Sequence, residues 1–194
     1  QERWKIQRGA SYFIPPEITG SHIGPRVCHT SGRVLPMGFR AAVAGSRAMG
    51  LEMDLRELTD YETVRVKAEI AAFKDRRGLL HTGRLHRLEV TDPQVLAERH
   101  VADDGGQFVL FAGQLQPSEQ TQARPICLTG LDPAARYSLQ LSNPQDVPAP
   151  LHRGPRSPLH TGEAITLSGT ALMHLGVQLP NAYPDTIWTL TGER

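Results

Sequence analysis

The spacing of hydrophobic residues changes part-way along the chain, near residue 88. Up to that point several segments have helical spacing, and beyond it short alternating runs are separated by glycine and proline. In the first part we expect, in order, a helix ending at Gly9, a strand at 11–14, a helix near 39–46, a strand at 51–55 and a helix from Thr59 to about Gly83. This alternation of helices and strands is typical of βα units.

The second part has the pattern of an all-β domain. Short strands are predicted at 108–111, 126–128, 137–141, 165–167, 171–175 and 187–190. Strict alternation in one of these runs would place Tyr137, Leu139 and Leu141 on a single buried face, because successive strand side chains point to opposite sides. We therefore predict an antiparallel sandwich of about six to eight strands.

Charge and hydropathy exclude several classes of partner. The chain has 21 Lys and Arg against 20 Asp and Glu, a net charge of +1, whereas a protein held to nucleic acid by counterion release has a basic excess. An uninterrupted apolar run of about 18 residues, as a membrane span requires, is missing. The charged start of the chain lacks the apolar stretch of a signal peptide, and Gln1 is not an initiator methionine. We expect a portion of a longer polypeptide, without nucleic-acid or membrane partners.

Cysteine and histidine usage argues against a disulfide framework and against a metal site. The two cysteines, Cys28 and Cys127, are too few for either a disulfide framework or a paired-cysteine zinc motif. Two free thiols are compatible with a reducing cytoplasm, which is the location we predict. The eight histidines show no helical pair with metal-ligand spacing, so no metal is expected.

Three groups of polar residues are candidates for chemistry. Gly20, Ser21 and His22 are expected in a loop at the end of a strand, where βα folds place binding groups; the alternative is a structural turn. The segment 28–33 contains a Cys-His pair, but a polar loop with Arg33 as a partner for hydroxyl or carboxylate groups is favoured over a thiol nucleophile. Glu52 and Asp54 have the spacing of a carboxylate pair, and an ion-pair or capping role with Arg40, Arg47 or Arg56 is favoured for them.

Two further patterns have a structural interpretation. Trp4, Trp188, Tyr12 and Tyr183 could stack on sugar rings, although aromatic residues with such spacing more often belong to a core. Thr59 and Glu62 have the spacing of a capping box, in which each side chain bonds the backbone N–H of the other residue. They predict the start of the long helix.

Several motifs resemble, in the same order, those of the family 36 glycoside hydrolases, the α-galactosidases. Residues 8–24 (RGASYFIPPEITGSHIG) are similar to R-G-x-S-x-x-x-P-P-x-x-M-G-x-H, residues 29–33 to N-H-Q-T-G-R, residues 49–55 to x-G-x-E-L-D-L, residues 79–84 to L-L-H-S-G-R and residues 128–133 to L-x-G-L-D-P. Thr19 and Cys28 depart from this pattern, because the family commonly has Met and Asn there.

The resemblance implies an α+β chain that contains the last βα units of a (β/α)8 barrel, followed by an antiparallel β-sandwich. Residues 1–88 would be the C-terminal part of the catalytic barrel and residues 89–194 the sandwich domain. On this mapping, residues 11–14 would be the seventh barrel strand and residues 51–55 the eighth.

The resemblance also implies a retaining hydrolase of terminal α-galactosides that needs no metal or organic cofactor. Its nucleophile and acid/base aspartates map upstream of Gln1, so no catalytic residue is assigned to this chain, and the chain alone is expected to be inactive. Gly20, Ser21, His22, His29 and Arg33 are carried over as substrate-binding residues.

Other assignments stay open. The β-sandwich could bind carbohydrate or mediate oligomer contacts, and the chain could belong to a related galactosyltransferase or α-N-acetylgalactosaminidase. Besides α-galactoside sugars, the expected partner is a second copy of the chain or the remainder of the same polypeptide.

Overall fold

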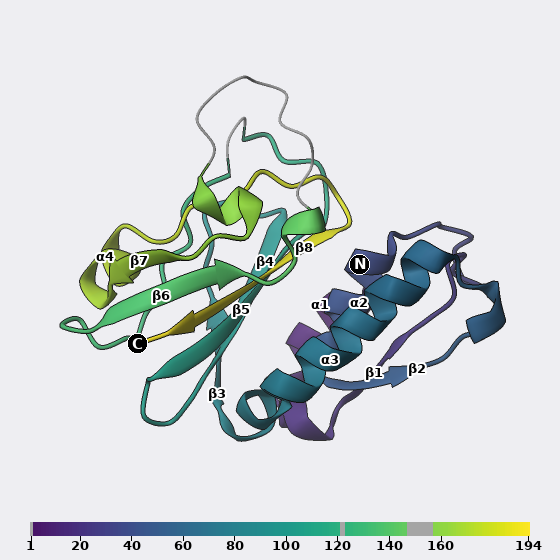
Figure 1. Cartoon of the computed structure of the whole chain (residues 1–194), viewed down its shortest axis with the longest axis horizontal. Helices are drawn as coiled ribbons and strands as arrows, with labels where there is room; N and C mark the ends of the chain where they lie inside the picture. Colours follow the sequence, from purple (N-terminus) through teal and green to yellow (C-terminus); the bar gives the residue numbers. More distant parts are fainter. Residues whose placement is uncertain (1, 121–122, 147–156) are drawn as a thin grey trace. The chain divides into compact units, whose positions relative to one another are not determined.

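The computed structural model describes residues 2–120, 123–146 and 157–194. The chain divides into two compact units, residues 1–83 and residues 84–194, and each is described by itself (Figure 1).

The first unit is a βαβ arrangement with additional helices. Its elements are α1 (Glu2–Ala10), β1 (Gly20–Ile23), α2 (Met37–Gly45), β2 (Ala48–Leu51) and α3 (Asp60–Thr82). Strands β1 and β2 are parallel, with Gly20 opposite Ala48 and Ile23 opposite Leu51. A small core formed by Ile23, Met37, Ala41, Ala44 and Val66 joins β1 to helices α2 and α3. The order strand, helix, strand was predicted from the sequence, but the residues that form the two strands, apart from Leu51, were not.

Helix α3 begins and ends where the sequence predicts. The Thr59 hydroxyl accepts a hydrogen bond from the Glu62 backbone N–H at 3.2 Å, and the Glu62 carboxylate accepts one from the Thr59 backbone N–H at 3.2 Å. Both halves of the capping box are therefore present, and they satisfy amides that the first turn leaves free.

Both strands of the first unit lie elsewhere than predicted. Residues 11–14 are not a strand, because helical bonding continues after α1: the Ser11 N–H donates to Gln7 at 3.0 Å and the Ile14 N–H to Ala10 at 2.9 Å. Strand β2 ends at Leu51, before most of the predicted 51–55. The Asp54 carboxylate then accepts a hydrogen bond from the Arg56 N–H and caps a short 3-10 turn, which takes the chain out of the strand.

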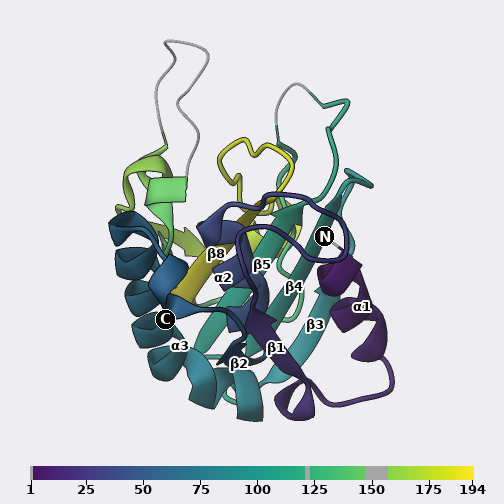
Figure 2. The ribbon, with the colours of Figure 1, turned by 90° about the vertical axis from the view of Figure 1, so that its right-hand side faces the viewer.

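The second unit contains a six-stranded antiparallel sheet among its described residues. Its strands are β3 (Arg84–Leu88), β4 (Val95–Val101), β5 (Gln107–Gln114), β6 (Arg136–Leu141), β7 (Ile165–Ser168) and β8 (Thr186–Glu193). Their order in the sheet is β3-β4-β5-β8-β6-β7 (Figure 1), and Figure 2 shows the part from β3 to β8. The C-terminal strand β8 therefore lies in the middle of the sheet, between β5 and β6.

One face of this sheet carries the larger core. Tyr137, Leu139 and Leu141 on β6 are buried in it, as their alternation predicts. Segments between the strands cover this face, and they contribute Leu128, Leu159, Leu172 and Val177 to the core. The predicted strand at 126–128 makes only an isolated bridge, between Ile126 and Val177.

The predicted strand at 171–175 is wrong, because most of this segment forms the short helix α4 (Gly169–His174). The Ser168 hydroxyl accepts a hydrogen bond from the Ala171 N–H at 3.1 Å and caps the helix. Gly169 is required at the first position, because a Cβ there would lie 1.9 Å from the Asp132 carbonyl oxygen. Local capping therefore prevails over the apolar alternation of the run.

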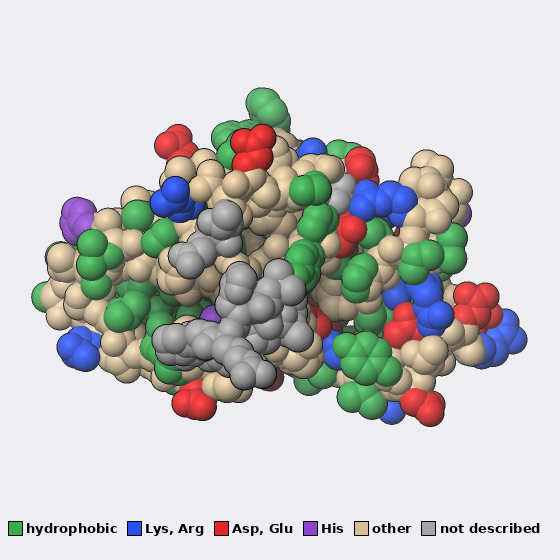
Figure 3. All heavy atoms as spheres, turned by 90° about the horizontal axis from the view of Figure 1, so that it is seen from above, with side chains coloured by type: hydrophobic (Ala, Val, Ile, Leu, Met, Phe, Trp, Pro, Cys, Tyr) green, Lys and Arg blue, Asp and Glu red, His purple; other side chains and the backbone are tan. Residues whose placement is uncertain are grey.

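The distribution of charge and the character of the helices bear on the partners predicted above. Lysine and arginine side chains are interspersed with acidic ones on the face seen in Figure 3. Among the described residues, no helix combines the length and apolar character that crossing a bilayer requires.

Candidate functional site

The carboxyl ends of the parallel strands β1 and β2 form one edge of the first unit. β1 ends at Ile23 and is followed by a connection to α2, and β2 ends at Leu51 and is followed by a connection to α3. In parallel βα folds, binding groups are placed in the connections that follow the carboxyl ends of strands. This edge is therefore the candidate site.

Alternation along β1 divides the predicted residues Gly20, Ser21 and His22 between two faces. Ser21 is fully buried, with its hydroxyl 3.4 Å from the Val43 carbonyl oxygen in α2. Gly20 and His22 lie on the other face and are exposed. These residues were predicted in a loop, but they form the strand itself, and only His22 presents a polar side chain on the exposed face.

The His22 ring lies against the backbone of Gly50. The two residues are opposite each other in the parallel register, and a Cβ on Gly50 would lie 2.4 Å from His22 Cδ2. The guanidinium of Arg3, in α1, donates a hydrogen bond to the His22 carbonyl oxygen at 3.1 Å. His22 is therefore held from two neighbouring elements.

Residues 26–35 form a short hairpin after β1, which we call the 26–35 hairpin. The Cys28 N–H donates to the Arg33 carbonyl at 2.9 Å, the Gly32 N–H to the Cys28 carbonyl at 2.7 Å, and Val27 and Val34 form a bridge. Gly32 has a φ of 68°, a left-handed conformation that glycine adopts without strain. His29 is in the turn and exposed, whereas Arg33 starts the returning arm and is half-buried.

The thiol of Cys28 is also in this turn. Hydrogen bonds from the Ser31 side chain, then from the Ser31 and Thr30 backbone, lower the pKa of the Cys28 thiol. Such bonds stabilise the thiolate. A polar loop was the favoured interpretation of residues 28–33. The hydrogen bonds that lower the pKa of Cys28 come from residues of this same segment, Thr30 and Ser31.

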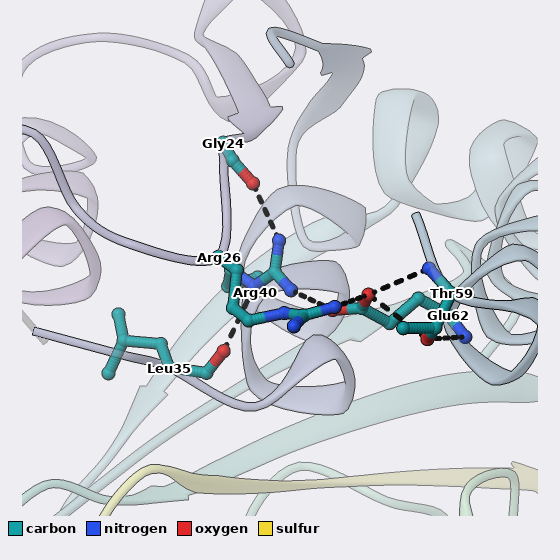
Figure 4. Close-up of polar contacts among 6 residues, drawn as sticks. All are labelled: Gly24, Arg26, Leu35, Arg40, Thr59 and Glu62. Atoms are coloured by element: carbon teal, nitrogen blue, oxygen red, sulfur yellow. Dashed lines mark hydrogen bonds and ion pairs between the residues drawn. The ribbon is translucent and has the colours of Figure 1, made fainter. Parts of the chain in front are cut away.

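A buried carboxylate anchors the 26–35 hairpin (Figure 4). Glu62 Oε1 accepts hydrogen bonds from Arg40 Nη2 at 2.8 Å and from Arg26 Nε at 3.2 Å, while Arg26 Nη2 pairs with Glu62 Oε2. Arg40 also donates from Nη1 to the Gly24 carbonyl at 2.7 Å and from Nε to the Leu35 carbonyl at 3.1 Å. One arginine thus bonds the chain just before the hairpin and at its last residue.

These pairs shift the pKa values of their members. Hydrogen bonding from Arg26, followed by the Thr59 bonds, lowers the pKa of Glu62 to about 2, against the opposing effect of burial. Burial lowers the pKa of Arg40, and Glu62 opposes that shift. Glu62 raises the pKa of Arg26. The network is therefore charged throughout the physiological pH range.

The acidic residues after β2 do not act as a pair. Asp54 binds Arg56, with 2.6 Å between its Oδ2 and Arg56 Nη2, and both side chains are exposed. Arg56 lowers the pKa of Asp54. Glu52 is exposed and continues the strand pairing through its N–H, which donates to the Ile23 carbonyl at 3.0 Å. The ion-pair and capping interpretation of Asp54 is confirmed.

The four aromatic candidates divide between the interior and the surface. Trp4 and Trp188 are buried, and Trp188 Nε1 donates to the Pro180 carbonyl at 2.9 Å, whereas Tyr12 and Tyr183 are exposed. In the part of the chain that the structure describes, no group of three or more His, Cys, Asp or Glu residues is arranged to hold a metal ion.

The sequence pattern offered Arg40 only as a possible partner of Glu52 or Asp54, and it did not indicate that Arg40 pairs with Glu62. Arg40 stands in a run of apolar residues in α2, and it is buried together with them. A charged residue at such a position is a usable signal, because buried charges are nearly always paired. The sequence does not indicate which carboxylate is the partner, since Glu62 follows 22 residues later.

Each of the two units matches a family model. Residues 1–83 match the family model described as Melibiase, and residues 96–190 match the Glycosyl hydrolase family 36 C-terminal domain. The chain belongs to glycoside hydrolase family 36. The resemblance found in the motifs is confirmed, and the two units correspond to the end of a (β/α)8 barrel and to a C-terminal β-sandwich.

Individual relatives extend this finding over the whole chain. The α-galactosidase of Escherichia coli is 33% identical over 100% of this chain and 28% of its own length, and α-galactosidase C of Emericella nidulans is 37% identical over 71% and 18%. The crystal structure of the family 36 α-galactosidase AgaB from Geobacillus stearothermophilus has a TM-score of 0.77 and 27% identity. It matches 98% of this chain, which covers 24% of that structure. The chain thus covers between 18% and 28% of the length of these relatives and matches a C-terminal portion of them.

Proposed function

We propose that this chain is the C-terminal portion of a retaining α-galactosidase, which hydrolyses terminal non-reducing α-galactosides through a covalent galactosyl–enzyme intermediate. The observation that carries the proposal is the edge formed by β1 and β2. It presents His22 and the 26–35 hairpin at strand carboxyl ends, in a chain matched over its whole length by an α-galactosidase.

In this proposal the chain supplies part of the sugar-binding surface. The exposed imidazoles of His22 and His29 and the guanidinium of Arg33 can hydrogen-bond sugar hydroxyls. Gly20, without a side chain, leaves room on the face that carries His22. Ser21 belongs to the site through its backbone, because its hydroxyl is buried against α2.

The two catalytic carboxylates belong, in the proposal, to the part of the enzyme that precedes residue 1. Removing both of them removes nucleophilic and acid/base catalysis together. The domain assignment is the one predicted above, a barrel part followed by a sandwich, with one change: its boundary is placed after residue 83 and not after residue 88, because β3 (Arg84–Leu88) pairs with β4 in the second unit. The natural partner of the β1–β2 pair is then the remainder of the same polypeptide, since strands in a barrel have a neighbour on each side. The two free thiols support a location in the reducing cytoplasm.

The direct test is an assay of the 194-residue chain on an aryl α-galactoside, beside the intact E. coli α-galactosidase as a positive control. We expect no turnover by the chain at concentrations equal to those of substrate. Turnover that increases in proportion to the amount of purified chain would overturn the proposal that both catalytic carboxylates lie outside it.

A further inference from the structure

Glu62 takes part in two structures at the same time. As the third residue of α3 it completes the capping box with Thr59, and as a carboxylate it binds Arg26 and Arg40. The side chains of Glu62 and Arg40 are 8% and 6% exposed, whereas that of Arg26 is 47% exposed. The pair between Glu62 and Arg40 is therefore shielded from water. Loss of either partner would leave the other as a buried charge without compensation.

Arg40 connects this carboxylate to both ends of the 26–35 hairpin. Its guanidinium bonds Glu62, the Gly24 carbonyl before the hairpin and the Leu35 carbonyl at its end. The N–H donors of a planar guanidinium point in fixed directions. The bond from Arg40 to Glu62 therefore also orients the two N–H groups that bond the Gly24 and Leu35 carbonyls. Arg26, the first residue of the hairpin, adds a second link to the same carboxylate.

We propose that Glu62 is a positioning residue, which holds the 26–35 hairpin at the carboxyl end of β1 through Arg40 and Arg26 and so places His29 and Arg33 for sugar binding. The last step of this inference rests on the proposed function. The first step concerns only the order of the hairpin, and it can be measured in the chain by itself.

A simpler role for Glu62 would be helix capping alone. Thr59→Ala separates the two roles, because it removes the hydroxyl of the capping box and leaves both arginine pairs in place. Glu69→Gln is a matched control, since Glu69 is a buried carboxylate in the same helix that pairs with Arg76, whose Nη2 also donates to the Gly45 carbonyl in α2.

The first experiment measures amide hydrogen exchange by NMR in the 194-residue chain and its variants. The reporters are the N–H groups of Cys28, Gly32 and Leu35, which all donate within the hairpin. Glu62→Gln is expected to accelerate their exchange about tenfold or more, and to change that of the β5 amides less than about twofold. Arg40→Gln should have the same effect, and the double variant should add little to either, because both act through one interaction.

Two results would overturn the positioning role. One is unchanged exchange of the hairpin amides in Glu62→Gln. The other is an equal acceleration in Thr59→Ala or Glu69→Gln. If Glu62→Gln does not fold, Arg26→Gln replaces it, because its side chain is half exposed; we then expect an acceleration of about threefold confined to the hairpin. Unchanged exchange in that variant counts against the proposal.

The second experiment tests the link to sugar binding in an active enzyme. This chain replaces the matching C-terminal portion of the E. coli α-galactosidase, and the fusion is assayed on an aryl α-galactoside. Glu62→Gln is expected to raise KM about fivefold while kcat changes less than about twofold, with Glu69→Gln as the control. Faster hairpin exchange with an unchanged KM would overturn the sugar-binding step. An unmodified fusion that folds without turnover would instead count against the proposed function.

Discussion

The imidazole of His22 occupies the space that a side chain at residue 50 would need. Gly50 is opposite His22 in the parallel register of β1 and β2, and a Cβ there would lie 2.4 Å from Cδ2 and 2.9 Å from Nε2 of the ring. The absence of a side chain on one strand therefore sets the position of the histidine on the other.

Gly50→Ala is expected to displace the His22 ring. Because the ring is at the exposed end of a side chain, the cost in unfolding free energy should stay below about 1 kcal/mol. The measurement is the chemical shift of the His22 ring proton on Cδ2, with Gly24→Ala as the control, since a Cβ there meets no atom within 4 Å. A ring resonance that is the same in both variants and the parent chain would contradict this packing.

Acid is expected to weaken the first unit through Glu62. The folded state holds the pKa of Glu62 at about 2, below its ordinary 4.5, so the charged carboxylate contributes stability above about pH 4.5 and that contribution is lost as pH falls toward 2. In Glu62→Gln the stability should be lower at neutral pH by on the order of 2–3 kcal/mol. The difference from the parent chain should shrink over the same acidic range. Urea unfolding at a series of pH values measures it, and a difference that is constant with pH would disagree with this pairing.

The hydroxyl of Tyr137 connects two turns of the second unit. It accepts a hydrogen bond from the Asp132 N–H at 3.1 Å and donates one to the Gly105 carbonyl at 3.2 Å, and the residue is fully buried. Tyr137→Phe leaves both backbone groups without this partner and should cost about 1–3 kcal/mol in urea unfolding. Tyr183→Phe, at a residue 52% exposed, should cost less than about 0.5 kcal/mol. Equal costs for the two variants would refute the role of the Tyr137 hydroxyl.

Helix α3 contains a glycine whose replacement by alanine should stabilise the chain. Gly78 is exposed, and a Cβ there would meet no atom within 4 Å. Gly78→Ala should therefore raise the free energy of unfolding by about 0.5–1 kcal/mol, because alanine favours the helix. Gly192→Ala is the opposite case, since its Cβ would lie 2.2 Å from Cζ of the buried Phe108. Thermal unfolding compares the two, and a Gly78→Ala chain that unfolds at a lower temperature than the parent would show this interpretation to be wrong.

Local signals in the sequence predicted much of the fold. The capping box at Thr59 and Glu62 and the alternation around Leu139 depend on neighbouring residues, and the structure confirms both. The run 11–14 was mispredicted because its apolar side chains suggest a strand, whereas Phe13 is 90% exposed and its N–H donates to the Ala10 carbonyl at 2.9 Å. An apolar run predicts burial, but the apolar side chains of residues 12–14 are exposed in the described part of the chain.

The site itself depends on contacts between distant residues, which no local pattern specifies. Motif resemblance indicated His22, but not the pairing with Gly50 that holds its ring in place. The sequence predicted the capping role of Glu62. Its partners Arg26 and Arg40 are 36 and 22 residues away in the sequence, so no local pattern indicates these bonds. Arg99 is a similar case, a fully buried arginine whose Nη2 donates to the Thr129 carbonyl and whose pKa burial lowers to about 10.

The most direct measurement is the turnover of an aryl α-galactoside by a fusion in which this chain replaces the matching C-terminal portion of the E. coli α-galactosidase. We predict turnover by the fusion, and none by the truncated E. coli enzyme or by the 194-residue chain alone. A fusion that folds but does not turn over the substrate, or turnover by the chain alone, would contradict the account.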